Sequence, residues 1–165
     1  MKIFKYINIF LFYSILGNLF ERFAMYFIDR TYVSGFMGSI FTPIYGFAIL
    51  IVLFIHNKLN IKNKYLKLLS EFIIYMFVLT ILEFLGGIFI ENVFNKIFWN
   101  YDNFKYNLGL YVSLETSLVW GSLSVLSLYF VHPLYKRIEN HIPKIVTIIM
   151  SIIFIVNLLF VLLVK

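Results

Sequence analysis

Long apolar stretches separated by short polar segments dominate this chain. Five of them are predicted helices, at residues 6–28, 42–56, 68–94, 109–131 and 144–164. An α-helix needs about 20 predominantly apolar residues to cross the hydrocarbon core of a bilayer. The second stretch is shorter, so it is expected to begin within the outer membrane interface. The pattern predicts an all-α fold, a polytopic membrane bundle of about five transmembrane helices that forms a single domain over residues 1–165.

Composition agrees with this pattern, because 62% of the 165 residues are hydrophobic and only 13% are charged. A soluble domain of this size could not bury so much apolar surface. The first apolar stretch resembles a signal peptide, but it has no small-residue cleavage site and is interpreted as a retained first helix. The bias towards Ile, Phe, Asn and Lys is typical of a bacterial genome rich in AT. We therefore expect a multi-pass protein of a bacterial plasma membrane with the lipid bilayer as its main partner.

The basic residues predict an orientation. The net charge is +6, which in a membrane protein indicates basic cytoplasmic loops rather than a nucleic-acid partner. With a cytoplasmic N-terminus, nine of the 14 lysines and arginines fall on the inner side, four of them in the segment 56–67. The distribution favours a cytoplasmic N-terminus and an outside C-terminus.

Two glutamates lie within predicted membrane helices. Glu21 and Glu83 each follow about 15 residues of helix, which places both roughly 22 Å from the inner side. Carboxyl groups at such depth are costly and are rarely retained for packing alone. Tyr45 is expected at a similar depth, because Thr42 can cap a helix and Pro43 suits its first turn. Glu21, Tyr45 and Glu83 are therefore candidates for an outward-facing polar pocket or a proton path, and helix-packing hydrogen bonds without a cargo are the alternative.

The fourth apolar stretch carries a stripe of small and polar residues. They recur at spacings of four and three, which is typical of a helix-packing seam: Ser113, Ser117, Trp120, Ser124 and Ser127. Glu115 enters the membrane at a depth similar to that of the other two glutamates. It points about 160–200° away from the seam and is not expected to join it.

The segment 94–107 contains six aromatic residues among 14 and is predicted to lie outside the membrane. Such residues anchor proteins at a membrane interface. The alternative is that they contact a ligand, with Trp99 and Tyr101 stacking on it and Asn100 or Asp102 providing a polar contact.

The sequence lacks the motifs of several kinds of catalytic, nucleotide-binding and metal-binding site. The chain contains no cysteine, no phosphate-binding loop of the G-x-x-x-x-G-K-[ST] type and no H-E-x-x-H. His56, His132 and His141 do not have the spacing of a metal site. We therefore expect no metal, no cofactor and no enzymatic activity.

Five segments in order carry a family resemblance: FYSILGNLFE, GFMGSIFTPIYGF, LEFLGGIFIENVF, FWNYDNFKYNLGLYVSLETSLVWG and HP. Together they resemble a family of small bacterial integral membrane proteins described as ABC transporter permeases of type IV. The resemblance covers residues 9–137 and includes Glu21, Tyr45 and Glu83. It departs at Asn18, where the family has tryptophan, at Asn100, where it has aspartate, and at Leu110, where it has arginine, so the chain is a divergent member.

The resemblance implies a permease-like subunit of a transport system of unknown substrate, with a separate ATP-binding subunit as a possible partner. One alternative is a non-transporting scaffold or regulatory subunit that binds its partner through the serine seam. Another is a membrane enzyme that acts on lipid or cell-wall precursors with Glu21 and Glu83 as acid and base. Five thin spans enclose little space, so a homo- or hetero-oligomer is expected.

Overall fold

The computed structural model describes residues 2–27 and 39–163, apart from the side chains of Lys2, Met25 and Phe27. The helices are α1 (Lys2–Phe27), α2 (Pro43–Lys58), α3 (Lys64–Phe94), α4 (Leu114–Leu126), α5 (His132–Glu139) and α6 (Lys144–Leu163). A π-helical turn, η1 (Ser127–Val131), joins α4 to α5 in one continuous helix. Extended structure among the described residues is limited to an isolated bridge between Asn107 and Ser113.

The predicted all-α membrane bundle is confirmed. Within residues 2–27 and 39–163, four helical stretches are long and apolar enough to cross a membrane: Ile3–Ala24, Lys64–Phe94, Leu114–Glu139 and Lys144–Leu163. The fifth helix, α2, is apolar but has only 16 residues, which corresponds to about 24 Å of helix. The chain is thus a multi-pass membrane protein with one shorter helix inside the bundle.

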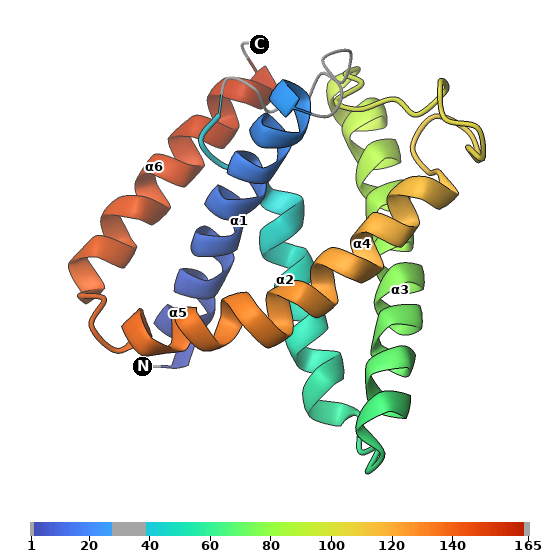
Figure 1. Ribbon diagram of the computed structural model, residues 1–165. Helices are drawn as coiled ribbons and strands as arrows, with labels where there is room; N and C mark the ends of the chain where they lie inside the picture. The colour runs from blue at the N-terminus through green and yellow to red at the C-terminus, as the bar shows by residue number, and fades with distance from the viewer. Residues whose placement is uncertain (1, 28–38, 164–165) are drawn as a thin grey trace.

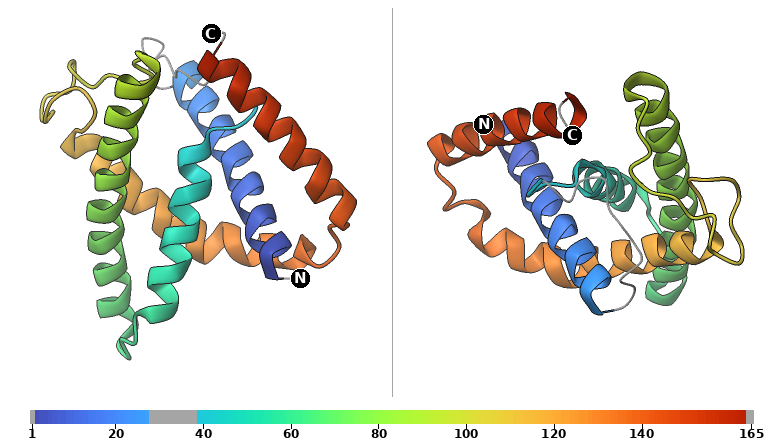
Figure 2. Two further views of the ribbon diagram at one scale, coloured as in Figure 1. Left: turned by 180° about the vertical axis from the view of Figure 1, so that it is seen from behind. Right: turned by 90° about the horizontal axis from the view of Figure 1, so that it is seen from above.

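Helices α6, α1, α2 and α3 stand in a row, and the continuous helix α4–η1–α5 slants across one side of that row (Figures 1 and 2). The central helix α2 contacts α1, α3, α4 and η1. Helix α1 begins and α6 ends at opposite ends of the bundle (Figure 1). Lys96, just after α3, donates to the carbonyl oxygens of Val161 and Leu162 at 3.2 and 3.0 Å, which ties α6 to the end of α3.

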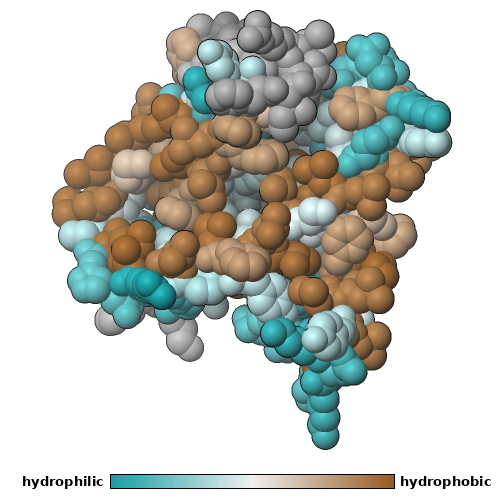
Figure 3. All heavy atoms as spheres, viewed as in Figure 1, coloured by the Kyte–Doolittle hydropathy of each residue, from teal (hydrophilic) through white to brown (hydrophobic). Residues whose placement is uncertain are grey.

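Apolar side chains cover the outside of the helices. Figure 3 shows a hydrophobic belt across the visible face, with hydrophilic residues gathered at the α2–α3 connection, around α5 and over the loop before α4. Large exposed apolar side chains include Phe77 of α3 and Ile152 of α6, which are 60% and 57% exposed. A bilayer would cover such a belt at little cost, because lipid chains are as apolar as these side chains.

Local chemistry explains the helix ends. The Asn63 side chain accepts hydrogen bonds from the backbone N–H groups of Tyr65 and Leu66 at the start of α3. Ser113 and Thr116 form a reciprocal capping box at the start of α4. Pro43 occupies the first turn of α2, as predicted, but Thr42 makes no side-chain cap. Its hydroxyl instead bonds to side chains of α1.

The fourth helix continues past residue 131, where the sequence pattern predicts its end, to Glu139. Proline inside a helix removes one hydrogen bond and crowds a carbonyl of the preceding turn. Here the π-helical turn precedes Pro133, and the N–H of His132 donates to the carbonyl of Ser127. The wider turn relieves the crowding, so the helix passes Pro133 without a break.

Candidate functional site

The three candidate residues from the first three helices line one cavity. The cavity, of about 250 Å³, lies between α1, α2, α3, α4 and the loop that precedes α4. Glu21 reaches it from α1, Tyr45 from α2 and Glu83 from α3. These residues are far apart in the sequence. The sequence predicts a similar depth for them in the membrane, and the packing of the helices brings them to one cavity.

Glycines bring these helices close together. A Cβ atom at Gly17 would overlap the ring of Tyr45, and one at Gly46 would meet the Ser14 hydroxyl and the Phe10 carbonyl. Helices α1 and α2 therefore cross with little space between their backbones. The crossing sets the Tyr45 ring against α1, at the edge of the cavity.

Glu21 is linked to a chain of polar groups that runs between α1 and α2. Thr42 donates its hydroxyl to Glu21 at 3.4 Å and accepts from the Asn18 amide at 3.2 Å. Arg22 donates to the Asn18 carbonyl oxygen at 2.8 Å and to the Ser39 backbone oxygen at 2.9 Å. Asn18, which differs from the family pattern, thus connects the Arg22 guanidinium to Thr42.

Glu83 is the most enclosed acid of the cavity, with 3% of its surface exposed. The Tyr101 hydroxyl donates to its Oε1 atom at 2.7 Å. Its Oε2 atom is buried and has no hydrogen-bond partner among the described residues. Tyr101 itself is held by a backbone hydrogen bond from its N–H to Leu110 at 2.8 Å.

The loop before α4 folds over the cavity. Trp99 and Tyr101 line it, whereas Asn100 and Asp102 are exposed and bond to each other at 3.1 and 2.7 Å. The two aromatic residues therefore face the enclosed space, and the two polar candidates face outward. The polar contacts of the cavity come from glutamates on the helices instead.

Tyr111 fastens the same loop to α3. Its ring packs against Gly87, and its hydroxyl donates to Glu91 at 2.8 Å. Burial, assisted by the neighbouring Glu91 carboxylate, raises the pKa of Tyr111 to about 12. The phenol therefore remains protonated, and able to donate, throughout the neutral range.

Glu115 also lines the cavity, so three carboxyl groups share it. Its Oε1 atom accepts a hydrogen bond from the Tyr106 backbone at 3.2 Å, and its Oε2 atom is buried without a partner among the described residues. Glu115 is a cavity residue outside the predicted set of Glu21, Tyr45 and Glu83. Its similar predicted depth in the membrane is the sequence signal that points to it.

The serine seam faces the interior of the same chain. Ser113, Ser117 and Ser124 are buried, and Ser117 Oγ lies 2.8 Å from Thr80 Oγ1 of α3. Trp120 lines the cavity described above, while Ser124 and Ser127 line a second one. The seam is thus occupied by α3 and by internal space.

The second cavity, of about 310 Å³, adjoins the first. Both are lined by Phe20, Tyr45, Trp120 and Leu123. The Tyr45 and Trp120 rings lie with centroids 5.0 Å apart and planes tilted by 41°. We name the first space the outer cavity and the second the inner cavity, and this aromatic pair stands between them.

A comparison with known protein families covers the helices and the loop that line the two cavities. Residues 8–164 match the model of the family described as "Putative ABC-transporter type IV". The chain belongs to this family. No curated protein and no solved structure matches the chain. The family match establishes a transport-related membrane protein and names no substrate.

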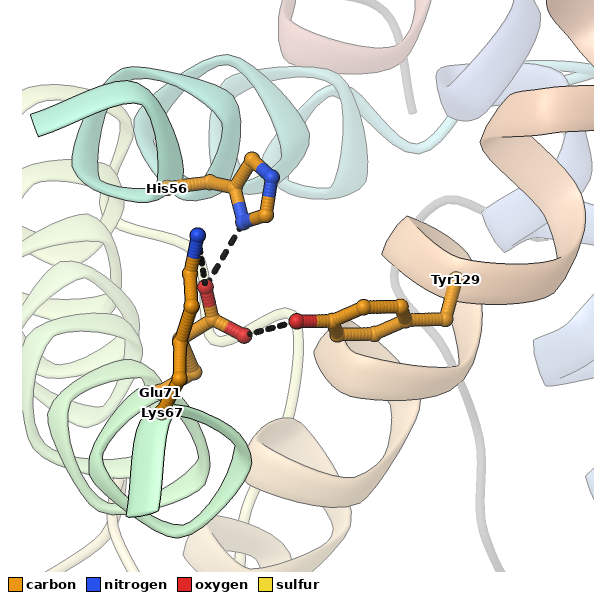
Figure 4. A network of polar contacts seen from close by, with 4 residues as sticks. All are labelled: His56, Lys67, Glu71 and Tyr129. Atoms are coloured by element: carbon orange, nitrogen blue, oxygen red, sulfur yellow. Dashed lines mark hydrogen bonds and ion pairs between the residues drawn. The ribbon is translucent and has the colours of Figure 1, made fainter. Parts of the chain in front are cut away.

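This member of the ABC-transporter type IV family holds a second polar network, which the sequence patterns do not reveal (Figure 4). Glu71 of α3 is fully buried, and its Oε1 atom lies 2.6 Å from His56 Nδ1 of α2. Tyr129 of η1 donates to its Oε2 atom at 2.7 Å, and Lys67 Nζ lies 3.9 Å from Oε1. The network joins three helices on the side of the α2–α3 connection.

The signal for this network is weak in the sequence. His56 stands out only as a possible metal ligand, and Glu71 lies near the polar start of a long apolar stretch. No group of three residues that could hold a metal occurs in the part of the chain that the structure describes. The π-helical turn supplies Tyr129, and such turns have no simple sequence signature.

A further cluster lies where α1 meets α5. Glu139 is bonded to Lys5 at 3.0 Å and to Lys136 at 3.3 Å. The neighbouring His132 and Tyr135 rings are buried and stacked, with centroids 5.9 Å apart. The cluster attaches the start of α1 to the end of the slanted helix.

Proposed function

We propose that this chain is a permease-like membrane subunit of a transport system, and that its outer cavity receives the substrate. The observation that carries the proposal is the pair of adjoining cavities, which share a wall at Tyr45 and Trp120. A transport subunit needs enclosed space along the membrane normal and a constriction that can open and close. The family match supports the same role.

The two cavities differ in their chemistry. The outer one contains three carboxyl groups, whereas the polar groups around the inner one are hydroxyls such as those of Tyr13, Ser124 and Ser127. Glu21 and Glu83 are proposed to bind a polar group of the substrate or to carry a proton. Tyr45 is proposed to act with Trp120 as the barrier between the cavities, since rotation of either ring would join the two spaces.

The energy source is proposed to be a separate ATP-binding subunit in a bacterial plasma membrane. The sequence has no phosphate-binding loop, so ATP would have to bind elsewhere. The N-terminus and the basic segment 56–67 are proposed to face the cytoplasm, where such a subunit would reside.

Recovery of the tagged chain from its native membrane in mild detergent, followed by mass spectrometry, tests this proposal. A stoichiometric ATPase with a phosphate-binding loop is the expected partner. Recovery of the chain with only itself, or with a membrane protein of another kind, would contradict an ATP-driven system.

The scaffold alternative assigns partner binding to the serine seam. Two residues of that seam, Ser117 and Ser124, are only 7% and 6% exposed within the folded chain, which leaves little of the seam for a partner to contact. A homo- or hetero-oligomer is still proposed, through other surfaces, because a bundle of about five spans encloses little space of its own.

A further inference from the structure

The lining of the outer cavity is rich in aromatic side chains. Seven of its sixteen lining residues are Phe, Tyr or Trp. They come from α1, α2, α4 and the loop before α4, so aromatic rings surround the space from several directions. Ring faces carry a partial negative charge, and they attract cations.

Apart from the tyrosines, the ionisable groups of this lining are all carboxyl groups, which can carry only negative charge. Three of its residues are glutamates, and none of the described lining residues is Lys, Arg or His. The guanidinium of Arg22, next to Glu21 in the sequence, is bonded to Asn18 and to the Ser39 backbone. An anionic ligand would meet carboxyl groups and ring faces, which both disfavour it.

Glu83 places a buried carboxyl group on the wall of the outer cavity. Its side chain is more than nine-tenths buried, Tyr101 uses one oxygen, and the other has no partner among the described residues. Buried polar atoms are almost always satisfied, so an unpartnered carboxyl oxygen on a cavity wall indicates a missing donor or cation. Glu115 Oε2 is also buried and has no hydrogen-bond partner among the described residues.

The cation that fits is organic rather than metallic. Metal ions such as Mg²⁺ or Ca²⁺ require several oxygen ligands at about 2.0–2.6 Å, and the described residues contain no group of three that could hold a metal. Aromatic rings together with a carboxylate are instead the recognition pattern for ammonium groups. The volume of about 250 Å³ lies just below the range of drug-sized ligand sites, about 300–1,000 Å³, and so suits a small molecule.

From these observations we infer that the outer cavity binds small organic ammonium ions that carry an apolar or aromatic group. The ammonium lies beside Glu83 and is surrounded by ring faces that include Tyr101 and Trp120. This inference rests on the proposed function, since it names the substrate class of the same cavity. The binding itself can be tested without any partner subunit.

The chain provides its own reporter for the test. It contains two tryptophans, Trp99 and Trp120, and both line the outer cavity. The purified protein in detergent is titrated with benzyltrimethylammonium while tryptophan emission is recorded. Its neutral isostere, in which carbon replaces the ammonium nitrogen, and the anion 3-phenylpropionate are titrated in parallel. We expect a saturable change with the ammonium ion and at least about tenfold weaker binding of the other two.

Variants assign the binding to Glu83. Glu83→Gln is expected to weaken ammonium binding at least about tenfold, because it removes the charge and retains the shape. Glu139→Gln is the control, since Glu139 is also buried but is paired with Lys5 and Lys136 and does not line the cavity. Circular dichroism and size-exclusion elution verify that both variants fold. If Glu83→Gln does not fold, Glu115→Gln and the comparison of the three probes on the unsubstituted chain still decide.

Equal binding of the ammonium ion and its neutral isostere would overturn the inference, as would no saturable change with any probe. An unchanged affinity in folded Glu83→Gln would also overturn it. Recovery of an ATPase together with absent ammonium binding would retain the transport proposal and reject only this ligand class. Ammonium binding without any ATPase partner would support this ligand class and contradict the ATP-driven transport system.

Discussion

At the level of single residues, Glu71 shows how this protein accommodates a buried acid. Its carboxyl group contacts His56 and Tyr129 from two other helices and is 0% exposed. An intact network of this kind contributes little net stability. Removing one of its members is nevertheless costly, because the remaining polar groups lose their hydrogen-bond partner. Glu71 is therefore a structural acid, whereas Glu83 retains an oxygen that faces a cavity.

The substitution Glu71→Ala is expected to lower the free energy of unfolding by about 1–3 kcal/mol, because it removes the buried acceptor that His56 and Tyr129 share. Glu71→Gln should cost less, since the amide oxygen can still accept from Tyr129. Thermal unfolding of the detergent-solubilised protein measures both. Lys67→Ala is the control and should change stability by less than about 1 kcal/mol, because its contact is long and partly exposed. Equal stability of Glu71→Ala and the unsubstituted chain would refute this role.

At the level of helices, close backbone contacts determine where the cavity lies. Gly17 and Gly46 allow α1 and α2 to cross tightly, and Gly121 lets α4 approach Phe72 of α3. Each contact leaves no room for a methyl group. Both cavities lie among these helices and share Tyr45 and Trp120 as lining residues.

The substitution Gly46→Ala is expected to destabilise the protein by about 1–3 kcal/mol, because the new methyl group meets the backbone carbonyl of Phe10. Gly86→Ala is the matched control, since the atom nearest to its added methyl group is 3.7 Å away in Trp99. Thermal unfolding of both variants is the measurement. A Gly46→Ala protein as stable as Gly86→Ala would show that α1 and α2 can separate at no cost.

At the level of the whole molecule, the orientation in the membrane decides which cavity faces which compartment. The loop before α4 lines the outer cavity, whereas the inner cavity is lined by residues farther along α2, nearer the α2–α3 connection. The basic segment 56–67 lies at that connection, so the positive-inside tendency predicts that the outer cavity faces away from the cytoplasm.

Single cysteines can test this orientation cleanly, because the chain has none of its own. Asn103→Cys, in the exposed loop before α4, should react with a membrane-impermeant thiol reagent in intact spheroplasts. Asn60→Cys, in the exposed α2–α3 connection, should react only after the membrane is permeabilised. The unsubstituted chain provides the background. The opposite pattern would invert the predicted orientation and turn the outer cavity towards the cytoplasm.

The sequence by itself determined the class of the protein and predicted a depth for its polar residues. Apolar stretches of spanning length require helices in a bilayer, because only internally bonded backbone is tolerated there. Depth follows from position, since each helical residue advances by about 1.5 Å. The common depth of Glu21, Glu83 and Glu115 therefore follows from their positions along the chain alone.

Only the tertiary structure decided which of these residues meet. The direction in which a side chain points, and the helix that it faces, depend on packing between helices and not on position along one of them. For this reason Ser117 and Ser124 are buried inside the chain. In the loop before α4, Trp99 and Tyr101 line the cavity, whereas Asn100 and Asp102 are exposed. For the same reason Glu71 gained partners that no spacing in the sequence predicted, since His56, Glu71 and Tyr129 belong to three different helical segments.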